Sequence, residues 1–334
     1  MKRSSFLAAA MYAAIYAAMC AALSLAFAPP ALAQAWPTRP VTLLVPYAPG
    51  GGHDTMARLV AERLTAKWGQ TVLVENKAGA NGMIGAEFVS HAPPDGHTLL
   101  FASPAEIVIA PTAYKSMRYD PFNDLAPVTL AGMTPLVVVA NPSAGVKTIP
   151  ELIAKVKANP GKFSFGTAGN ASSQHLAGVL LNNMAGIDLV HIPYKGAGPA
   201  TTDVVGGQTP LAIVGMAPVM GYIKSGKLVA LAVTQSRRAS FAPDIPTVAE
   251  TPGLGGFEAT HWMGVFAPAK TPADIVKKVQ ADIHDVVNAP DMKARLLSLG
   301  IEPVGSTPAE FKSFLAADRD RFARMFKLTG LSPE

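Results

Sequence analysis

The stretch "VPYAPGGGHDTMARLV", residues 45–60, joins an apolar segment to an amphipathic one through three consecutive glycines. Residues 41–46 are apolar and few in number, as in a buried strand. Apolar residues then recur at helical spacing from Met56 to Trp68, and Gly69 is a typical residue at a helix C-terminus. The stretch therefore predicts a strand, a glycine-rich turn and a helix in succession.

The same alternation continues along the chain. Short apolar segments predict further strands at 71–74, 97–102, 136–140, 162–166, 189–193, 211–214, 228–234 and 262–267. Segments with helical periodicity lie between them, at 85–91, 149–158, 172–185, 199–205 and 218–225, and two more helices finish the chain. This order predicts an α/β fold built on a parallel sheet with helices on its faces.

The predicted elements fall into two groups, joined at 136–140 and again near 257–267. We therefore expect two lobes with a double crossover between them. Lobe 1 would comprise 34–138 and the returning segment 257–334, and lobe 2 would comprise 139–256. Ligands of α/β proteins bind in clefts at the carboxyl ends of strands, so the cleft between the lobes is the predicted site.

A threonine followed three positions later by an acidic residue marks three predicted helix starts. The pairs are Thr148 with Glu151, Thr271 with Asp274, and Thr307 with Glu310. In such a capping box, each side chain accepts a hydrogen bond from the backbone N–H of the other residue. We expect these pairs to define the helix boundaries.

The first 33 residues have the order of a secretory signal peptide. Lys2 and Arg3 precede an almost wholly apolar run over residues 6–28, and a small-x-small cleavage pattern ends at Ala33. We predict a signal peptide at residues 1–33, cleaved after Ala33, and a periplasmic mature protein. A membrane anchor is the alternative, because the apolar run is longer than a usual signal peptide core.

Cleavage after Ala33 would leave 334 − 33 = 301 residues and would remove Cys20, the single cysteine. The mature chain could then form neither a disulfide nor a thiolate metal site. Loss of Lys2 and Arg3 would lower the formal charge from +5 to +3. This mild positive charge suits a small anion and does not indicate nucleic-acid binding. We predict no metal and no cofactor.

The glycine loop at Gly50–Gly52 matches neither nucleotide-binding motif. A P-loop needs Lys and Ser or Thr after its last glycine, and a dinucleotide fingerprint needs glycines that stand elsewhere in the spacing. Glycine nevertheless lets backbone N–H groups approach a ligand, and a helix N-terminus favours an anion. A carboxylate site and a tight turn without a ligand both fit the sequence.

The two residues after the glycines have polar side chains. Asp54 is expected to cap the helix by accepting hydrogen bonds from the N–H groups of Met56 or Ala57, since a free carboxylate would repel an anionic ligand. His53 could donate a hydrogen bond to a ligand or carry charge near pH 6.5.

Two later stretches repeat the pattern of strand, small polar loop and helix. They are "FGTAGNASSQHLAGVLL" at 165–181 and "IPYKGAGPATTDVVGGQ" at 192–208. Ser172 or Ser173 is expected to cap the helix that follows the first loop, and His175 is expected to be packed or capping. Recurrence of such loops at strand ends favours one site formed by several backbone donors over isolated turns.

Several segments together carry a family resemblance. They are "WPTRPVTLLVPYAPGGGHDTMARLVAERL", "VENKAGANGMIGAEFV", "DGHTLLFAS", the two stretches above, and "GVFAPAKTP". In this order they resemble the extracytoplasmic solute-binding proteins of tripartite tricarboxylate transporters, the Bug family, over essentially the whole mature chain. The resemblance implies a two-lobed periplasmic binding protein of the Venus-flytrap type, which holds a carboxylate between its lobes, often through ordered water.

The resemblance also implies which residues bind the ligand and implies no catalytic residue. In lobe 1 they are Pro49, Gly50, Gly51, Gly52, His53, Asp54 and Thr55. In lobe 2 they are Thr167, Ala168, Ser172, Tyr194, Gly196, Ala197 and Asp203. Ser103, and Met216 with Ala217, lie where the distal part of a ligand would be recognised.

The implied function is capture of a di- or tricarboxylate, aromatic ones included, by a monomer that delivers it to the permease subunits of the transporter. Two alternatives stay open. One is a ligand-sensing receptor of a signalling system. The other is an exported serine hydrolase using Ser172 or Ser173, for which the sequence marks no orienting acid and no G-x-S-x-G motif.

Overall fold

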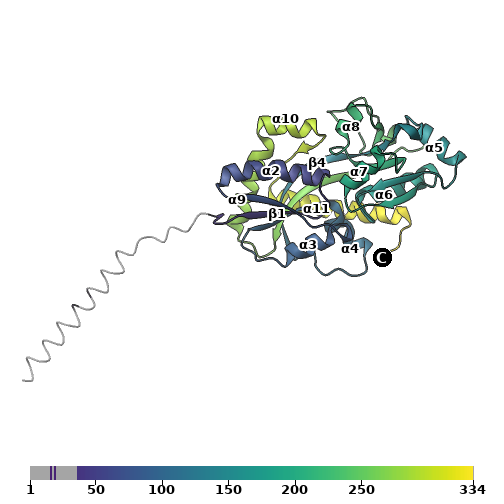
Figure 1. Ribbon diagram of the computed structural model, residues 1–334. Coiled ribbons are helices and arrows are strands. Elements are labelled where there is room, and N and C mark those ends of the chain that lie inside the picture. The colour runs from purple at the N-terminus through teal and green to yellow at the C-terminus, as the bar shows by residue number, and fades with distance from the viewer. Residues whose placement is uncertain (1–15, 17–18, 20–35, 334) are drawn as a thin grey trace, which may run out of the picture. The chain divides into compact units, whose positions relative to one another are not determined.

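The computed structural model describes Tyr16, Met19 and residues 36–333. Apart from those two residues, the predicted signal peptide at 1–33, with its cleavage site, lies outside the described part. Arg39–Glu334 form one compact unit, shown as a ribbon in Figure 1. Among the described residues, no helix combines the length and the apolar character that a membrane crossing requires.

The first group of strands has the predicted parallel order. β1 (Val41–Val45) lies between β2 (Val72–Asn76) and β3 (Thr98–Ala102) and pairs with both in parallel. The connecting helices are α2 (Gly52–Trp68) and α3 (Met83–Ser90). This arrangement brings the turn after β1, and therefore the glycine loop, to the carboxyl edge of the parallel strands.

Two long strands link the groups and make the sheet mixed, which corrects the prediction of a parallel sheet. β4 (Leu125–Ala140) is sixteen residues long and extends well before the predicted strand at 136–140. Its first part pairs antiparallel with β9 (Thr260–Pro268), and its last part pairs antiparallel with β7 (Leu211–Gly215) and β8 (Val229–Val233). The sheet is mixed because these strands carry the chain between the groups instead of closing a β-α-β unit.

The second group repeats the α/β pattern. β5 (Ser164–Thr167) pairs in parallel with β6 (Val190–Pro193) and with β7. The strand order is β2-β1-β3-β9-β4-β7-β5-β6, with β8 and β10 (Glu302–Pro303) also on β4. The helices of this group are α5 (Ile149–Ala158), α6 (Ser173–Ala185), α7 (Ala197–Val205) and α8 (Met220–Lys224).

The chain returns to the first group between β8 and β9. Thr234 N–H donates to Leu136 O on β4 at 2.9 Å, and Ala259 N–H donates to Thr234 O at 2.9 Å. β4 and this returning segment form the predicted double crossover, so the two-lobed α/β fold is confirmed. The lobe limits at 138/139 and 256/257 stay predictions.

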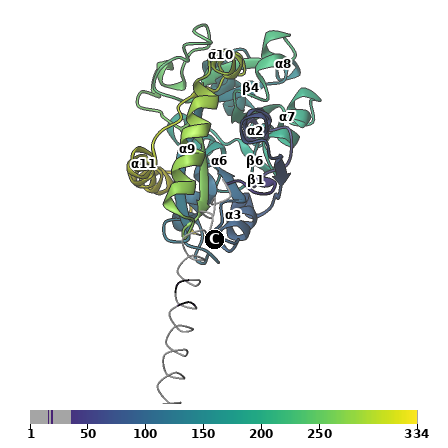
Figure 2. The ribbon, with the colours of Figure 1, turned by 90° about the vertical axis from the view of Figure 1, so that its left-hand side faces the viewer.

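The C-terminal part folds as three helices in the described residues, not two as predicted. They are α9 (Ala273–Asn288), α10 (Pro290–Ser298) and α11 (Pro308–Thr329). Figure 2 shows α9 from its outer side, with α11 and α2 on either side of it. Trp68 Nε1 donates to Asp282 Oδ2 at 2.7 Å, which joins α2 to α9.

Five shorter helical segments complete the described part of the chain, and none of them was predicted from the sequence. They are η1 (Ala80–Gly82), the π-helical turn η2 (Ala105–Ile109), α4 (Ala110–Ala113), η3 (Pro142–Ala144) and η4 (Val248–Glu250). Of these, η2 carries Glu106, which is hydrogen-bonded to Tyr47, a residue of the cavity described below.

The three predicted capping boxes have three outcomes. The box of Thr307 and Glu310 is complete. Thr148 accepts from the N–H of Glu151, but the carboxylate of Glu151 accepts from the N–H of Lys147 instead, at 2.7 Å. The box at Thr271 was wrong, because α9 starts one residue later, after Pro272, and has no side-chain cap.

Candidate functional site

The glycine loop leads directly into α2. The helix begins at Gly52, earlier than the predicted start near Met56, and Gly51 is its N-cap with an extended backbone at φ −80°. Gly50 has φ +87°, a conformation that favours glycine. The N–H groups of the first helical residues therefore have no partner within the helix and face the loop.

Asp54 has its carboxylate occupied, as predicted, but by other partners. Oδ2 accepts from Gly50 N–H and Arg58 Nε, both at 3.0 Å, and Oδ1 accepts from Asn76 Nδ2 at 3.0 Å. Asp54 lies inside the first turn and not at the N-cap, which is why the predicted bonds to Met56 or Ala57 do not form. Burial alone would raise its pKa, but bonds from Arg58, Gly50 and Asn76 outweigh burial and lower it.

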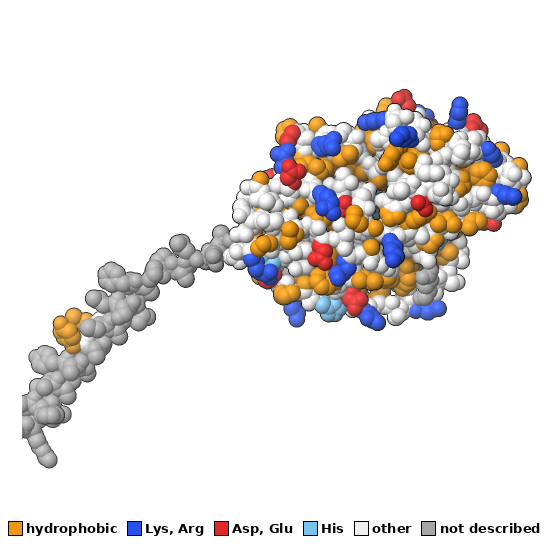
Figure 3. Space-filling model, viewed as in Figure 1, with side chains coloured by type: hydrophobic (Ala, Val, Ile, Leu, Met, Phe, Trp, Pro, Cys, Tyr) orange, Lys and Arg blue, Asp and Glu red, His pale blue; other side chains and the backbone are white. Residues whose placement is uncertain are grey.

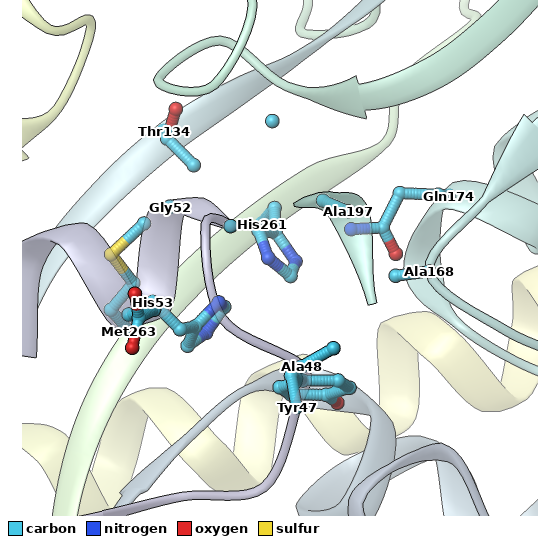
Figure 4. Close-up of a pocket in the computed structure, with 13 residues that line it drawn as sticks. Tyr47, Ala48, Gly52, His53, Thr134, Ala168, Gln174, Ala197, His261 and Met263 are labelled. Atoms are coloured by element: carbon cyan, nitrogen blue, oxygen red, sulfur yellow. The ribbon is translucent and has the colours of Figure 1, made fainter. Parts of the chain in front are cut away.

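His53 is neutral near pH 7, which corrects the expectation of a charge near pH 6.5. Burial lowers its pKa to about 4, and hydrogen bonding to the backbone of Trp262 and Ala102 opposes this shift only in part. The ring packs against Tyr47, with centroids 5.5 Å apart, and against His261, at 5.0 Å. Figure 4 shows the ring of His53 turned toward that of His261.

One cavity lies where three helix N-termini meet. The first turns of α2, α6 and α7 contribute Gly52, Gln174 and Ala197 to its wall. The complete lining is Tyr47, Ala48, Gly51, Gly52, His53, Asp54, Thr134, Ala168, Gln174, Ala197, Gly215, His261 and Met263. Its volume is about 20 Å³, room for roughly one water molecule. A ligand larger than water can therefore enter only when the lobes separate.

The structure brings some of the predicted site residues to this cavity and places others behind it. Those in the lining are Gly51, Gly52, His53, Asp54, Ala168 and Ala197. Those outside the lining are Pro49, Gly50, Thr55, Ser103, Thr167, Ser172, Tyr194, Gly196 and Asp203, as well as Met216 and Ala217. Their role in ligand binding stays a prediction.

Most side chains outside the lining hold the loops in place. Thr55 Oγ1 donates to Gly51 O at 3.0 Å, and Ser172 Oγ donates to Gly169 O at 2.7 Å while capping α6. Tyr194 Oη donates to Asp203 Oδ2 at 2.6 Å. These bonds preorganise the backbone donors that face the cavity.

The histidine behind the Ser172 loop has the packed role expected of it. His175 accepts from Ala171 N–H at 3.0 Å and stacks on His191, with ring centroids 3.9 Å apart. Thr167 Oγ1 is hydrogen-bonded to His191 Nε2 at 2.6 Å. These three side chains support the loop that presents Ala168.

Sequence reasoning missed more than half of the lining. Tyr47 and Ala48 stand in the opening stretch and Gln174 follows the predicted caps, so proximity could have suggested them. Thr134, Gly215, His261 and Met263 come from β4, β7 and β9. No local signal marks those four, because the mixed pairing of the crossing strands brings them to the cleft.

The serine that could act as a nucleophile lacks the rest of a triad. Ser173 Oγ is hydrogen-bonded to His261 Nδ1 at 2.8 Å, but no carboxylate hydrogen-bonds to His261 in the described part of the chain. Burial, and then neighbouring His53, hold the pKa of His261 well below its usual value. An imidazole so reluctant to take a proton is a poor general base.

The lobes touch directly beside the cavity. Ala48 N–H donates to Lys195 O at 2.9 Å, and the Cα of Gly198 lies against the Pro49–Gly50 backbone. A Cβ on Gly51 would meet Ala197 Cβ at 3.7 Å. The structure is therefore a closed form, in which glycine backbone from both lobes interlocks.

The family model for "Tripartite tricarboxylate transporter family receptor" matches residues 56–331. The chain belongs to this family. Three solved structures illustrate the likeness of this receptor. A periplasmic binding protein named BugD is 35% identical, with a TM-score of 0.85, over 90% of the receptor and 100% of that chain.

Two structures from Rhodopseudomonas palustris contain a ligand. Rpa4515 with adipate is 31% identical, with a TM-score of 0.86, over 90% of the receptor and 100% of that chain. MatC with bound malate is 31% identical, with a TM-score of 0.81, over 87% of the receptor and 99% of that chain. Family and fold together identify the receptor as a solute-binding protein.

A buried carboxyl group lies behind Tyr47 of the receptor. Glu106 Oε2 accepts from Tyr47 Oη at 2.7 Å and from Ser103 Oγ at 2.8 Å, and Oε1 accepts from Ser103 N–H at 2.7 Å. Burial raises the pKa of Glu106 to about 7, although these hydrogen bonds oppose the shift. Ser103, which was predicted at the distal part of the ligand, is hydrogen-bonded to Glu106.

Glu106 is expected to make stability fall as pH rises between about 4.5 and 7. Its pKa is higher in the folded than in the unfolded chain. Its contribution to stability is therefore complete below pH 4.5 and is lost as the pH rises through 7. The slope for one group is at most about 1.4 kcal/mol per pH unit. Urea unfolding of the native receptor and of Glu106→Gln at pH 5 and pH 7 measures it.

The difference in unfolding free energy between the native receptor and Glu106→Gln reports on Glu106 alone. Buried histidines with lowered pKa values change stability in the opposite direction, but they are common to both proteins and cancel. The native receptor should lose stability relative to Glu106→Gln as pH rises. A pH-independent difference would show that Glu106 is already ionised in the folded protein at pH 5, and therefore that its pKa is not raised.

Proposed function

We propose that this receptor binds an organic carboxylate in the periplasm, between its lobes, and delivers it to the permease of a tripartite tricarboxylate transporter. The observation that carries the proposal is the convergence of three helix N-termini on one cavity. Each N-terminus offers unpaired N–H groups and the positive end of a helix dipole.

The charges around the cavity are compatible with an anion. The one carboxylate in the lining, that of Asp54, is bonded to Gly50 N–H, Arg58 and Asn76, and the salt bridge to Arg58 balances its charge. Over the face in Figure 3, basic and acidic side chains are interspersed, which suits a small local ligand better than nucleic acid. Adipate and malate in the related structures are both carboxylates.

Delivery requires export and a change of shape. We place cleavage after Ala33, for which N-terminal sequencing of the periplasmic protein is the test, and we expect a monomer. The lobes would open to admit the ligand and close over it, and closure would be the signal to the permease. Co-purification with membranes would tell a permease partner from a sensor kinase.

A panel of mono-, di- and tricarboxylates should contain at least one that raises the melting temperature. A ligand present at 100 times its Kd adds about 2.7 kcal/mol to the stability of the folded state. Differential scanning fluorimetry measures the shift, with uncharged amides of the same acids as controls. A folded, ligand-free protein that responds to no carboxylate would refute the proposal.

A further inference from the structure

His53 lines the cavity and has one ring nitrogen without a hydrogen-bond partner. Its side chain is 7% exposed, and its Nε2 atom is buried without a partner. An unpaired buried polar atom costs about 1–3 kcal/mol, so a ligand that supplied the missing partner would recover this free energy. Other polar groups at the cavity, such as those of Asp54 and Thr134, already have their partners.

The protonation of the ring decides what that partner must be. Burial keeps the imidazole neutral, and hydrogen bonding to the backbone oxygens of Trp262 and Ala102 requires one ring N–H. Nε2 has no partner, so we place the hydrogen on Nδ1, the tautomer that this bonding selects. Nε2 then presents a lone pair, which is an acceptor and needs a donor.

The surroundings favour a neutral donor. Tyr47, Phe101 and His261 enclose the ring and bring no charge. A cationic donor would lack a counter-ion, because the carboxylates of Asp54 and Glu106 are already hydrogen-bonded. A second ligand carboxylate could bind here only by protonating a desolvated imidazole, and the cavity lining contains no Lys or Arg.

The structure assigns His53 as the residue that reads a ligand hydroxyl: Nε2 accepts a hydrogen bond from the hydroxyl of a hydroxycarboxylic acid whose carboxylate lies at the helix N-termini. This assignment rests on the proposed carboxylate function and narrows its substrate class. The hydroxyl of such a ligand would give the buried Nε2 atom a hydrogen-bond donor. The corresponding acid without the hydroxyl would leave Nε2 unpaired.

Ligand pairs that differ by one hydroxyl test the assignment. We would measure Kd by isothermal titration calorimetry at pH 7 for malate and succinate, lactate and propionate, and mandelate and phenylacetate. In at least one pair the hydroxy acid should bind about 10- to 100-fold more tightly. His53→Phe keeps the ring packing but removes the acceptor. The ratio of the two Kd values in a pair should therefore fall to about one, while the acid without the hydroxyl still binds.

His284→Phe is the matched control. His284 is an exposed histidine on α9 that also bonds to a backbone oxygen, Gly305 O at 2.6 Å, and it lies outside the cavity lining. The control should retain the hydroxyl preference. Near-ultraviolet circular dichroism of both variants checks that each is folded.

The outcomes separate the assignment from the function. Binding of carboxylates without a hydroxyl preference, or a preference that survives in His53→Phe, would overturn the assignment alone. If no member of any pair binds, both fail. Calorimetry in phosphate and Tris buffers adds an independent readout, since equal enthalpies are expected for a neutral His53, and His53-dependent proton uptake would indicate a second carboxylate at this position.

Discussion

Gly198→Ala should weaken carboxylate binding by about 100-fold while both lobes stay folded. A Cβ at this position would lie closer than 3.0 Å to Pro49 O, a backbone atom of the opposite lobe that cannot swing away. Overpacking of this kind costs about 1–3 kcal/mol, and 1.4 kcal/mol is a factor of ten in affinity. A ligand-bound form that keeps the contact between Gly198 and Pro49 would bear this cost, and the open form would not.

The same substitution should not lower the stability of the ligand-free protein. Gly198 lies in the first turn of α7, where alanine is the better helix former. Titration calorimetry with the tightest ligand of the panel gives the affinity, and thermal unfolding without ligand gives the stability. Gly221→Ala on α8 is the control, because its Cβ would meet no heavy atom within 4 Å. Native affinity in Gly198→Ala would mean that the ligand-bound form does not keep the contact between Gly198 and Pro49.

Trp262→Ala should lower the free energy of unfolding by about 3–5 kcal/mol, the range for removal of a large buried aromatic side chain. Trp262 on β9 is fully buried, and its ring lies 5.7 Å from that of Phe311 on α11. Its Nε1 donates to Asp318 Oδ2 at 2.7 Å, so truncation also leaves a buried carboxyl group with one partner fewer. Urea unfolding should show a lower midpoint at an unchanged slope.

The control for this variant is Leu328→Ala near the end of α11. Leu328 is 68% exposed, so its truncation should change stability by less than about 0.5 kcal/mol. A similarly small loss in Trp262→Ala would show that β9 is not the structural link between the sheet and α11.

Local sequence signals predicted the elements where each segment carries its own pattern. The strand at 41–46 and the helix ending at Gly69 are confirmed, with Gly69 in the left-handed conformation at φ +65°. The capping box at Thr307 is confirmed because its two side chains bond to each other's backbone within one turn. The helix at 290–298 was missed, since it follows α9 after a single residue and reads as its continuation.

The site residues also divide into those that a local pattern marks and those that only strand pairing brings to the cleft. Gly51, Gly52 and Ala197 lie in loops that follow a strand and precede a helix, a pattern visible in the sequence, and the family resemblance assigned them to the ligand. His261 and Met263 were missed because β9 reads as an ordinary buried strand. Their place in the cleft follows from the antiparallel pairing of β9 with β4, which lies at least 125 residues earlier in the chain. The pairing runs from Pro135 opposite Thr260 to Leu125 opposite Pro268.

The sequence by itself determined the α/β elements, the two lobes and the glycine loops at the ends of strands. These features depend on periodicity and on glycine, which act over a few residues. The tertiary structure alone decided that the sheet is mixed, that Asn76 completes the set of partners of Asp54, and that His53 is buried against His261. Strand pairing, burial and the bond from Asn76 set these properties, and all of them come from segments that are distant in the chain.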